Sequence, residues 1–189
     1  MHERDENLDN ESWEIRETFA YFGQTYYMAC CLEVGLAHAL MYGEFLMRQH
    51  QVIVATKGKE FDRRRYEADF DAFMEKHFSK TMGGVAQLAI KLPNFTIELK
   101  QRIEEARKRR NFLAHHYWRE RSAKFANSRG REEMRKELAA DRDMFAKLDK
   151  DIDEAMKPTR EKLNIDDKRL AEVSEKIIRQ MIDGTRGDE

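Results

Sequence analysis

One short stretch, RRNFLAHHYW at 109–118, combines groups that can bind phosphate or move protons with residues typical of a helix core. An arginine presents a planar, permanently charged fork to a phosphate. A histidine titrates near neutral pH, so it can act as a general base or acid. The candidate catalytic residues are Arg110, His115 and Asn111, the last of which could orient His115 or hold a phosphate oxygen. Such a set could cleave RNA without a metal, because RNA carries its own nucleophile, the 2′-OH.

The spacing places Arg110 on the side of a helix that is expected to be buried. From Leu92 to Tyr117, apolar residues recur every three or four positions, and Arg110 stands where this pattern asks for leucine. Burying an unpaired guanidinium costs on the order of several kcal/mol, so Arg110 needs a partner or a cleft. Glu33, beside the apolar stripe of the first predicted helix, is a candidate structural partner. Asn111 and His115, four residues apart, are expected on the adjoining strip of surface.

The motif leaves several interpretations open. His115 is five residues from Arg110, about 140° around an ideal helix, so a symmetric pair of copies could surround a phosphate better than one copy. His116 lies outside this spacing and is expected at the surface. Tyr117 and Trp118 could stack on a base or belong to the core. The plainer alternative is that Arg110 makes a purely structural ion pair.

Positive charge gathers around the motif. The whole chain is balanced, with 35 Lys and Arg against 36 Asp and Glu, but residues 100–131 carry eleven Lys or Arg and three acids, a local charge of +8. A basic segment in a neutral protein is a candidate site for a polyanion, although it could also be a solvated helix face. The residues expected to hold an RNA backbone, with strong salt dependence, are Arg107, Lys108, Arg109, Arg119 and Arg121.

The elements that position these residues are predicted to be helices, because the chain has many apolar and charged residues but only two prolines. The helices are expected over about 12–48, 63–77, 85–92, 95–117, 128–158 and 166–181. The residues expected to face inward in the first helix include Ile15, Phe19, Phe22, Tyr26 and Cys30, and those in the last helix are Leu170, Val173, Ile177 and Met181.

Between the first two helices, 51–61 is expected to be a connection, and Pro158 is expected to end or kink the fifth helix. The fold class is therefore all-α, an up-and-down bundle of four long helices plus shorter ones. Residues 1–189 are expected to form one domain, with a C-terminal helical extension at 161–183.

At this point the residues resemble a known family. RNFLAHHY matches the R-x4-H signature of HEPN domains (higher eukaryotes and prokaryotes nucleotide-binding), and the R-x4-H-x-Y form found in HEPN toxins. YFGQTYYMACCLEVGLAHAL resembles the first helix of such domains, and SKTMGGVAQLAIKL resembles the T-x-G-x-L segment that often precedes the motif helix. The resemblance covers roughly residues 15–160.

The resemblance implies a HEPN-like fold, a homodimer with both motifs in one cleft, and a metal-independent endoribonuclease concerned with toxin–antitoxin control or defence. It also implies a nucleotidyltransferase-type antitoxin as partner, which adenylylates the motif tyrosine, here Tyr117. Many HEPN domains only bind RNA, nucleotide or a partner protein, so a non-catalytic binding module is a second hypothesis. A purely structural helical protein is a third.

Other chemistries lack their sequence patterns. None of the six histidines has glutamate three residues before it, and there is no H-E-x-x-H, no Gly-rich phosphate loop before a lysine and no G-x-S-x-G. We therefore expect no metal and no cofactor. Cys30 and Cys31 are adjacent, which favours reduced cysteines in a cytoplasmic protein. The N-terminus is acidic, and the longest charge-free run, Thr18–Leu32, is too short and polar to span a bilayer, so we expect no signal peptide and no membrane.

Overall fold

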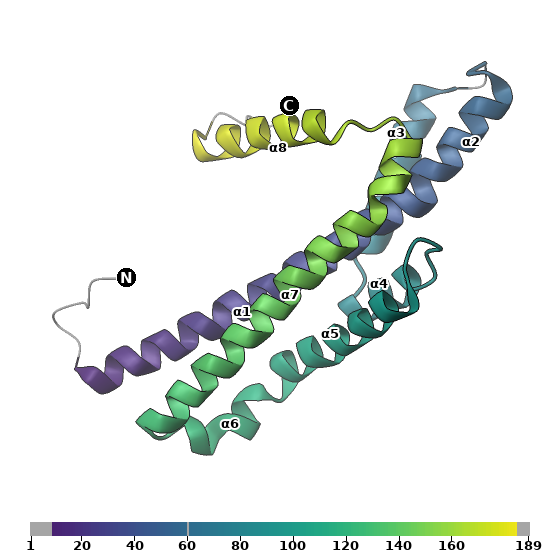
Figure 1. The fold of residues 1–189 in the computed structure, drawn as a ribbon. Helices are drawn as coiled ribbons and strands as arrows, with labels where there is room; N and C mark the ends of the chain where they lie inside the picture. Colours follow the sequence, from purple (N-terminus) through teal and green to yellow (C-terminus); the bar gives the residue numbers. More distant parts are fainter. Residues whose placement is uncertain (1–8, 60, 185–189) are drawn as a thin grey trace.

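The computed structural model describes residues 9–59 and 61–184, and within these ranges every regular element is a helix, which confirms the all-α prediction. In chain order the elements are α1 (Asn10–Leu40), the π-helical segment η1 (Met41–Leu46), α2 (Met47–Thr56), α3 (Arg63–Phe78), α4 (Met82–Ala89), α5 (Ile97–His115), α6 (Tyr117–Phe125), α7 (Ser128–Lys162) and α8 (Asp167–Ile182). Figure 1 shows α1 and α7 side by side along most of the molecule, with α5 next to the pair.

Short polar side chains fix where five of these helices begin. Each accepts a hydrogen bond from a backbone N–H of the first turn, which would otherwise have no partner. The capping residues are Asp9, Asp62, Thr96, Asn127 and Asp166. For α1 the cap is therefore Asp9, which accepts from the N–H of Ser12, and the helix starts slightly before the predicted boundary.

The core lies between α1, α4, α5 and α7. α1 and α7 run in the same direction and α5 runs against them (Figure 1). Thr25 of α1 donates from its hydroxyl to the Leu138 carbonyl of α7 at 2.8 Å in a buried contact between the two long helices. The leucines on the facing sides of these helices are fully buried, and burying each one stabilises the fold by roughly 2 kcal/mol. They include Leu32, Leu36, Leu40, Leu138 and Leu148.

The register of α1 differs from the predicted stripe. Phe19, expected to face inward, is 51% exposed and packs only at the edge, against the rings of Trp118 and Phe125 at centroid distances of 4.8 and 5.4 Å. The buried line is instead Thr25, Ala29, Leu32 and Leu36. Phe22 and Tyr26 of the predicted stripe still pack, partly buried, at the edge of the core, so Phe19 is the member that falls outside it.

The connection predicted at 51–61 is wrong in its first half. The helix continues from α1 through η1 into α2 and ends at Thr56, where Lys57 and Gly58 both take positive φ values of 53° and 75°. That left-handed pair ends the helix. The chain then returns as α3, close to its predicted bounds, and packs on the ring of Phe45.

The apolar stripe from Leu92 to Tyr117, which we call the α5 seam, matches the sequence pattern closely. Its apolar members are buried, and they are Leu92, Phe95, Leu99, Ile103, Ala106, Leu113 and Tyr117. The helix does not reach Tyr117 in one piece, however. It stops at His115, His116 takes the non-helical values φ −129° and ψ −25°, and α6 begins at Tyr117.

At the start of α7 the chain turns sharply. Gly130 is required there, because a Cβ at this position would lie 2.0 Å from the Lys124 carbonyl oxygen. At its other end α7 runs through Pro158 to Lys162, four residues beyond the predicted stop.

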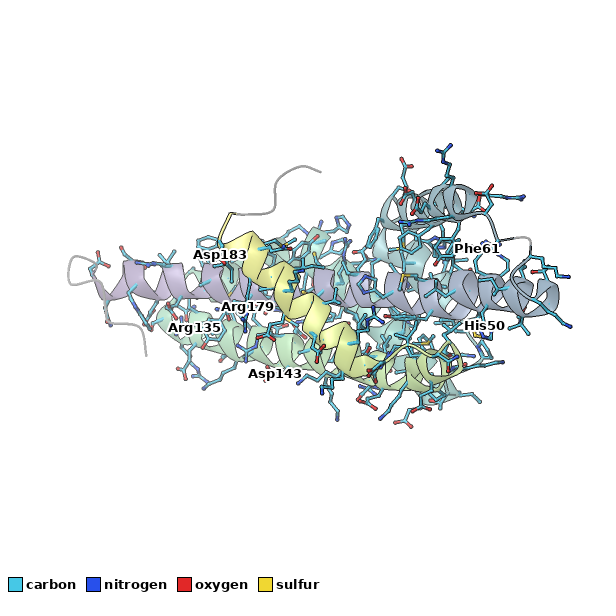
Figure 2. The ribbon with its side chains drawn as sticks, turned by 90° about the horizontal axis from the view of Figure 1, so that it is seen from above. His50, Phe61, Arg135, Asp143, Arg179 and Asp183 are labelled. Atoms are coloured by element: carbon cyan, nitrogen blue, oxygen red, sulfur yellow. The ribbon has the colours of Figure 1, made fainter. Side chains whose placement is uncertain are left out.

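The C-terminal helix α8 does not pack as predicted. None of its residues is buried, and Leu170, Val173 and Met181, expected to face inward, are exposed. Figure 1 shows α8 standing clear of α1 and α7, and Figure 2 shows it crossing over them when seen from above. A short linker, residues 163–166, carries it away from the bundle. The apolar periodicity predicted the helix correctly but did not predict that it would remain unpacked.

The long N-terminal helix is more apolar than the 15-residue run suggested. The continuous segment Asn10–Thr56 is long and apolar enough to cross a membrane, a criterion that core helices of soluble proteins also meet. In its most apolar 18-residue window, 33% of the residues are buried. The argument from the length of Thr18–Leu32 therefore does not exclude a membrane.

Candidate functional site

Arg110 lies on the face of α5 that is turned toward α1, where its side chain is only 17% exposed. Its Nη2 lies 3.6 Å from Oε2 of Glu33, the partner expected from the sequence. The guanidinium carbon also lies 5.7 Å from the ring centroid of Tyr26, about two helical turns before Glu33 on α1. The seam position of Arg110 is thus accommodated by one acidic and one aromatic side chain from the first helix.

This environment leaves the guanidinium incompletely satisfied. A distance of 3.6 Å is too long for a hydrogen bond, and Nε of Arg110 is buried without any hydrogen-bond partner. Burial raises the pKa of Glu33, and the charge of Arg110 opposes this only in part. Glu33 is therefore a weakened counter-ion, and the guanidinium of Arg110 is only partly satisfied inside the fold.

Asn111 and His115 extend the motif toward the surface. Asn111 is half-buried, whereas His115 is exposed and is the last residue of α5. Because Arg110 is directed at α1 and His115 lies about 140° further round the helix, one chain presents the two groups in different directions. A single copy therefore does not enclose a phosphate between them.

His116 is exposed, as expected, and belongs to the helix break. Its Nδ1 accepts a hydrogen bond from Nη2 of Arg119 at 2.9 Å. Since an arginine can only donate, the ring nitrogen must be the unprotonated one. The His116 side chain is thus held against α6 by this contact with Arg119, which stabilises the break between α5 and α6.

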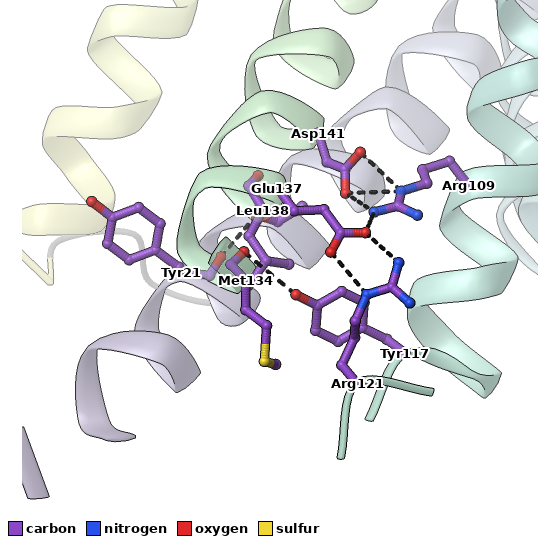
Figure 3. A network of polar contacts seen from close by, with 9 residues as sticks. Tyr21, Arg109, Tyr117, Arg121, Met134, Glu137, Leu138 and Asp141 are labelled. Carbon is purple, nitrogen blue, oxygen red and sulfur yellow. Dashed lines mark hydrogen bonds and ion pairs between the residues drawn. The ribbon is translucent and has the colours of Figure 1, made fainter. Parts of the chain in front are cut away.

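Two of the arginines expected to hold RNA are engaged by carboxylates of α7 (Figure 3). Arg109 donates to both oxygens of Asp141 at 2.6 to 2.9 Å and to Glu137 at 2.7 Å. Arg121 donates to the two oxygens of Glu137 at 2.9 and 2.7 Å. The guanidinium carbons of Arg109 and Arg121 lie 4.8 and 5.3 Å from the ring centroid of Phe112.

This network, which we call the α7 clamp (Arg109, Arg121, Glu137 and Asp141), ties α5 and α6 to α7. The hydrogen bonds from Arg121 and Arg109 outweigh burial and lower the pKa of Glu137 to about 2. The carboxylate is therefore ionised at any physiological pH. Both arginines have their donors directed at protein acids, so the expectation that they bind an RNA backbone is not supported.

The remaining predicted backbone ligands differ among themselves. Arg107 pairs with Glu104 one turn earlier on α5, and this contact lowers the pKa of Glu104. Lys108 is exposed, and Arg119 is 73% exposed while holding His116. Lys108 and Arg119 are thus the most exposed of the predicted cations, although Arg119 also lies 3.8 Å from Glu120.

Tyr117, the residue considered for stacking or modification, is fully buried. Its ring contacts Phe22 and Phe112, and its hydroxyl donates to the Met134 carbonyl at a long 3.5 Å. Burial strongly raises the pKa of the Tyr117 hydroxyl. In this conformation Tyr117 is a core residue, and neither a base nor a modifying enzyme reaches it.

Sequence reasoning missed the acids of the α7 clamp. A signal for one of them was present, because Asp141 interrupts an otherwise apolar periodicity on α7, just as Arg110 interrupts that of α5. A charge on a seam indicates a partner on the helix that faces it. Among residues 9–59 and 61–184, no group of three His, Cys, Asp or Glu side chains is placed to hold a metal ion.

Comparisons with known proteins do not extend this description: no family model, no curated protein and no solved structure matches the chain.

Proposed function

We propose that this protein is a metal-independent endoribonuclease of the HEPN type, with a site completed by two copies of the chain. The observation that carries the proposal is the state of Arg110: a half-buried guanidinium whose Nε has no hydrogen-bond partner, on the same helix as the exposed His115. The 3.6 Å contact with Glu33 satisfies this guanidinium only in part, so a phosphate that reaches its Nη groups would compete with Glu33 for it.

The proposed reaction uses the 2′-OH of the RNA as nucleophile. The neutral imidazole of His115 in one copy removes the hydroxyl proton, and the 2′ oxygen attacks the adjacent phosphorus. The bond from phosphorus to the 5′ oxygen breaks, and the protonated His115 of the second copy donates a proton to that oxygen. The products are a 2′,3′-cyclic phosphate and a 5′-hydroxyl. Arg110 stabilises the negative charge that builds on the phosphoryl oxygens, and Asn111 holds a phosphate oxygen or orients His115.

A non-catalytic RNA- or nucleotide-binding module is the second candidate, and the α7 clamp favours it. With Arg109 and Arg121 paired to α7, the open cations near the motif reduce to Lys108 and Arg119. That is a small electrostatic footprint for holding a long RNA backbone. A short single-stranded RNA or a nucleotide is the better substrate for such a site.

Cleavage of a short RNA in the presence of EDTA tests the proposal. We expect cyclic-phosphate products from the wild type, and no product when the 2′-OH at the cleaved position is replaced by hydrogen. His115→Ala should slow cleavage by about 10²- to 10⁴-fold without changing the unfolding midpoint, because His115 is exposed. Lys108→Ala, equally exposed on the same helix, is the matched control and should lower affinity only.

The role of Arg110 needs a variant that keeps its charge. Arg110→Lys preserves the charge beside Glu33 but removes the planar fork, so we expect a folded protein with strongly reduced cleavage. Binding without cleavage that still depends on Arg110 would identify the binding module instead. Cleavage that is unaffected by His115→Ala would overturn the proposed reaction.

Partners and location belong to the same proposal. A HEPN toxin in this sense acts as a homodimer in the cytoplasm and is held in check by a nucleotidyltransferase-type antitoxin. Because Tyr117 is buried here, regulation by modification of this tyrosine would require α6 to open first.

A further inference from the structure

The last turn of α2 is apolar and exposed on several sides at once. Val52 is 47%, Ile53 37% and Val54 62% exposed, and no residue of α2 is buried. Consecutive residues of a helix point about 100° apart, so these three side chains leave the helix in three directions. The neighbouring helix α3 does not close over them, because a cavity of about 790 Å³ lies between α3 and the side of α2 that carries Val52 and Ile53.

Folding does not account for this apolar turn. Its three side chains are not part of the hydrophobic core. Valine and isoleucine also have a slightly lower helix propensity than most residues, because they are branched at Cβ. They therefore stabilise neither the core nor the helix end, and a contact outside the chain is the gain that remains.

Positive charge surrounds the apolar turn. Residues 47–59 include three basic residues and no acid, in a chain whose acids and bases are otherwise balanced. Two of these, Lys57 and Lys59, are exposed in the turn that follows α2. The next helix, α3, then begins with three consecutive exposed arginines at 63–65.

The acids beside the turn do not cancel this charge. Asp62 caps α3 by accepting from the backbone N–H of Arg65 at 3.2 Å. Glu67 accepts from Nε of Arg63 at 2.8 Å, but this pair is 54% and 83% exposed, so it is weak. Over residues 47–65 there are six basic residues and two acids, so the charge is 6 − 2 = +4.

We propose that this end of the molecule binds the surface of a membrane that contains anionic lipids. The surface, which we call the hairpin tip, consists of the apolar residues Val52, Ile53, Val54 and Phe61 and the basic residues Lys57, Lys59, Arg63 and Arg64. The apolar side chains enter the boundary between headgroups and acyl chains, and the basic side chains contact the anionic headgroups. Figure 1 shows the turn between α2 and α3 at one end of the molecule, and Figure 2 shows Phe61 near that end, as contact with a flat surface requires.

The shape of the apolar surface favours lipid over a protein or an RNA. A protein helix or groove covers one face of a helix, whereas hydrocarbon surrounds side chains that point in several directions. RNA is bound by stacking its bases on aromatic rings, which valine and isoleucine do not offer. The one aromatic ring of the hairpin tip, Phe61, already packs against Tyr66 at a centroid distance of 5.8 Å.

The other exposed apolar surfaces of the described chain lack this combination. The helix α8 exposes Leu170, Val173 and Ile178, but its residues include three acids beside four basic residues. The face of α1 with Tyr27 and Val34 lies in a stretch without lysine or arginine. At the hairpin tip, exposed aliphatic side chains and an excess of positive charge coincide. This inference does not depend on the proposed reaction.

Flotation of the protein with lipid vesicles tests the contribution of charge. We expect the wild type to float with vesicles of phosphatidylcholine and phosphatidylserine, far more weakly with phosphatidylcholine alone, and less as the salt concentration rises. The double variant Lys57→Glu, Lys59→Glu should lower the partition coefficient at least about 20-fold, since each basic residue at the surface contributes about fivefold. The matched control is Lys147→Glu, Lys150→Glu, which makes the same change at exposed positions of α7 and should float like the wild type.

The apolar contribution is tested separately. The double variant Val52→Ser, Val54→Ser should lower the partition coefficient about tenfold or more with an unchanged unfolding midpoint, because both side chains are exposed. Ile178→Ser, at a 55% exposed position of α8, is the matched control. In the variant Val54→Trp, brominated lipids should quench the added tryptophan fluorescence, whereas Trp13 and Trp118 of the wild type should not be quenched.

Three results would overturn the proposal. The first is no flotation with either vesicle composition, or flotation that neither variant of the hairpin tip reduces. The second is flotation that is lost in Ile178→Ser instead, which would assign the lipid contact to α8. The third is a protein that does not bind vesicles but loses RNA affinity in Lys57→Glu, Lys59→Glu, which would make the tip an RNA surface. A protein that floats as expected but does not cleave RNA would leave this inference standing and remove only the proposed reaction.

Discussion

Removal of the charge on Glu137 should test the α7 clamp most directly. Folding lowers the pKa of this carboxyl from its ordinary 4.5 to about 2, chiefly through the hydrogen bonds from Arg121 and Arg109. Its side chain is 25% exposed, so solvent screening is limited. A shift of this size corresponds to about 3 kcal/mol of stability at neutral pH. Glu137→Gln should therefore lower the free energy of unfolding by about 2 to 3 kcal/mol at pH 7.

The stabilisation by Glu137 should depend on pH in a predictable direction. Because the pKa is lower in the folded than in the unfolded protein, the stabilisation is fully present above pH 4.5 and is lost as the pH falls toward 2. Urea unfolding followed by circular dichroism at pH 7, 5, 4 and 3 should show the wild type and Glu137→Gln converging as the pH falls. Glu133→Gln, which breaks the exposed pair with Lys124, should change stability little. A constant difference between wild type and Glu137→Gln across this range, or no difference at pH 7, would refute the reasoning.

Two further predictions concern the ends of α7 and the packing of α8. Gly130→Ala should destabilise the protein by about 2 kcal/mol or more in urea unfolding, because its Cβ would lie 2.0 Å from the Lys124 carbonyl oxygen and the turn between α6 and α7 would have to open. A change of less than a few tenths of a kcal/mol would show that this turn is not tightly constrained. The backbone amides of α8 should exchange with deuterium much faster than those of α7, since no residue of α8 is buried. Protection of α8 equal to that of α7 would mean that it packs in solution.

The sequence predicts the helices well where the apolar period is regular. The α5 seam from Leu92 to Tyr117 is buried as its spacing indicates, and α3 and α7 begin where the pattern starts. These are local consequences of amphipathic spacing and capping. The partner of Arg110 could also be expected, because a charge on a seam of one helix requires an acid on the helix that faces it.

Long-range packing could not be predicted in the same way. The aromatic residues of α1 suggested a stripe that includes Phe19, whereas contact with α7 selects Thr25 and Ala29. The amphipathic pattern of α8 indicated a buried face, but a pattern does not say whether a partner is present in the same chain. The segment 51–56 joined the helix because β-branched residues lower helix propensity only slightly when a turn continues from a stable helix.

Two adjacent arginines show why a local charge of +8 is a poor measure of a phosphate site. Arg109 is directed at α7, where its donors are occupied by hydrogen bonds to Asp141 and Glu137. Arg110, one residue and about 100° further round the helix, is directed at α1, where Glu33 lies too far for a hydrogen bond. The two side chains have the same chemistry and similar burial, and only the facing helix distinguishes them. A run of basic residues therefore does not show which of its arginines is able to bind a phosphate. The acids on the neighbouring helices determine which arginines already have their donors occupied. In this chain the donors of Arg109 are occupied by α7, whereas the buried Nε of Arg110 remains without a partner.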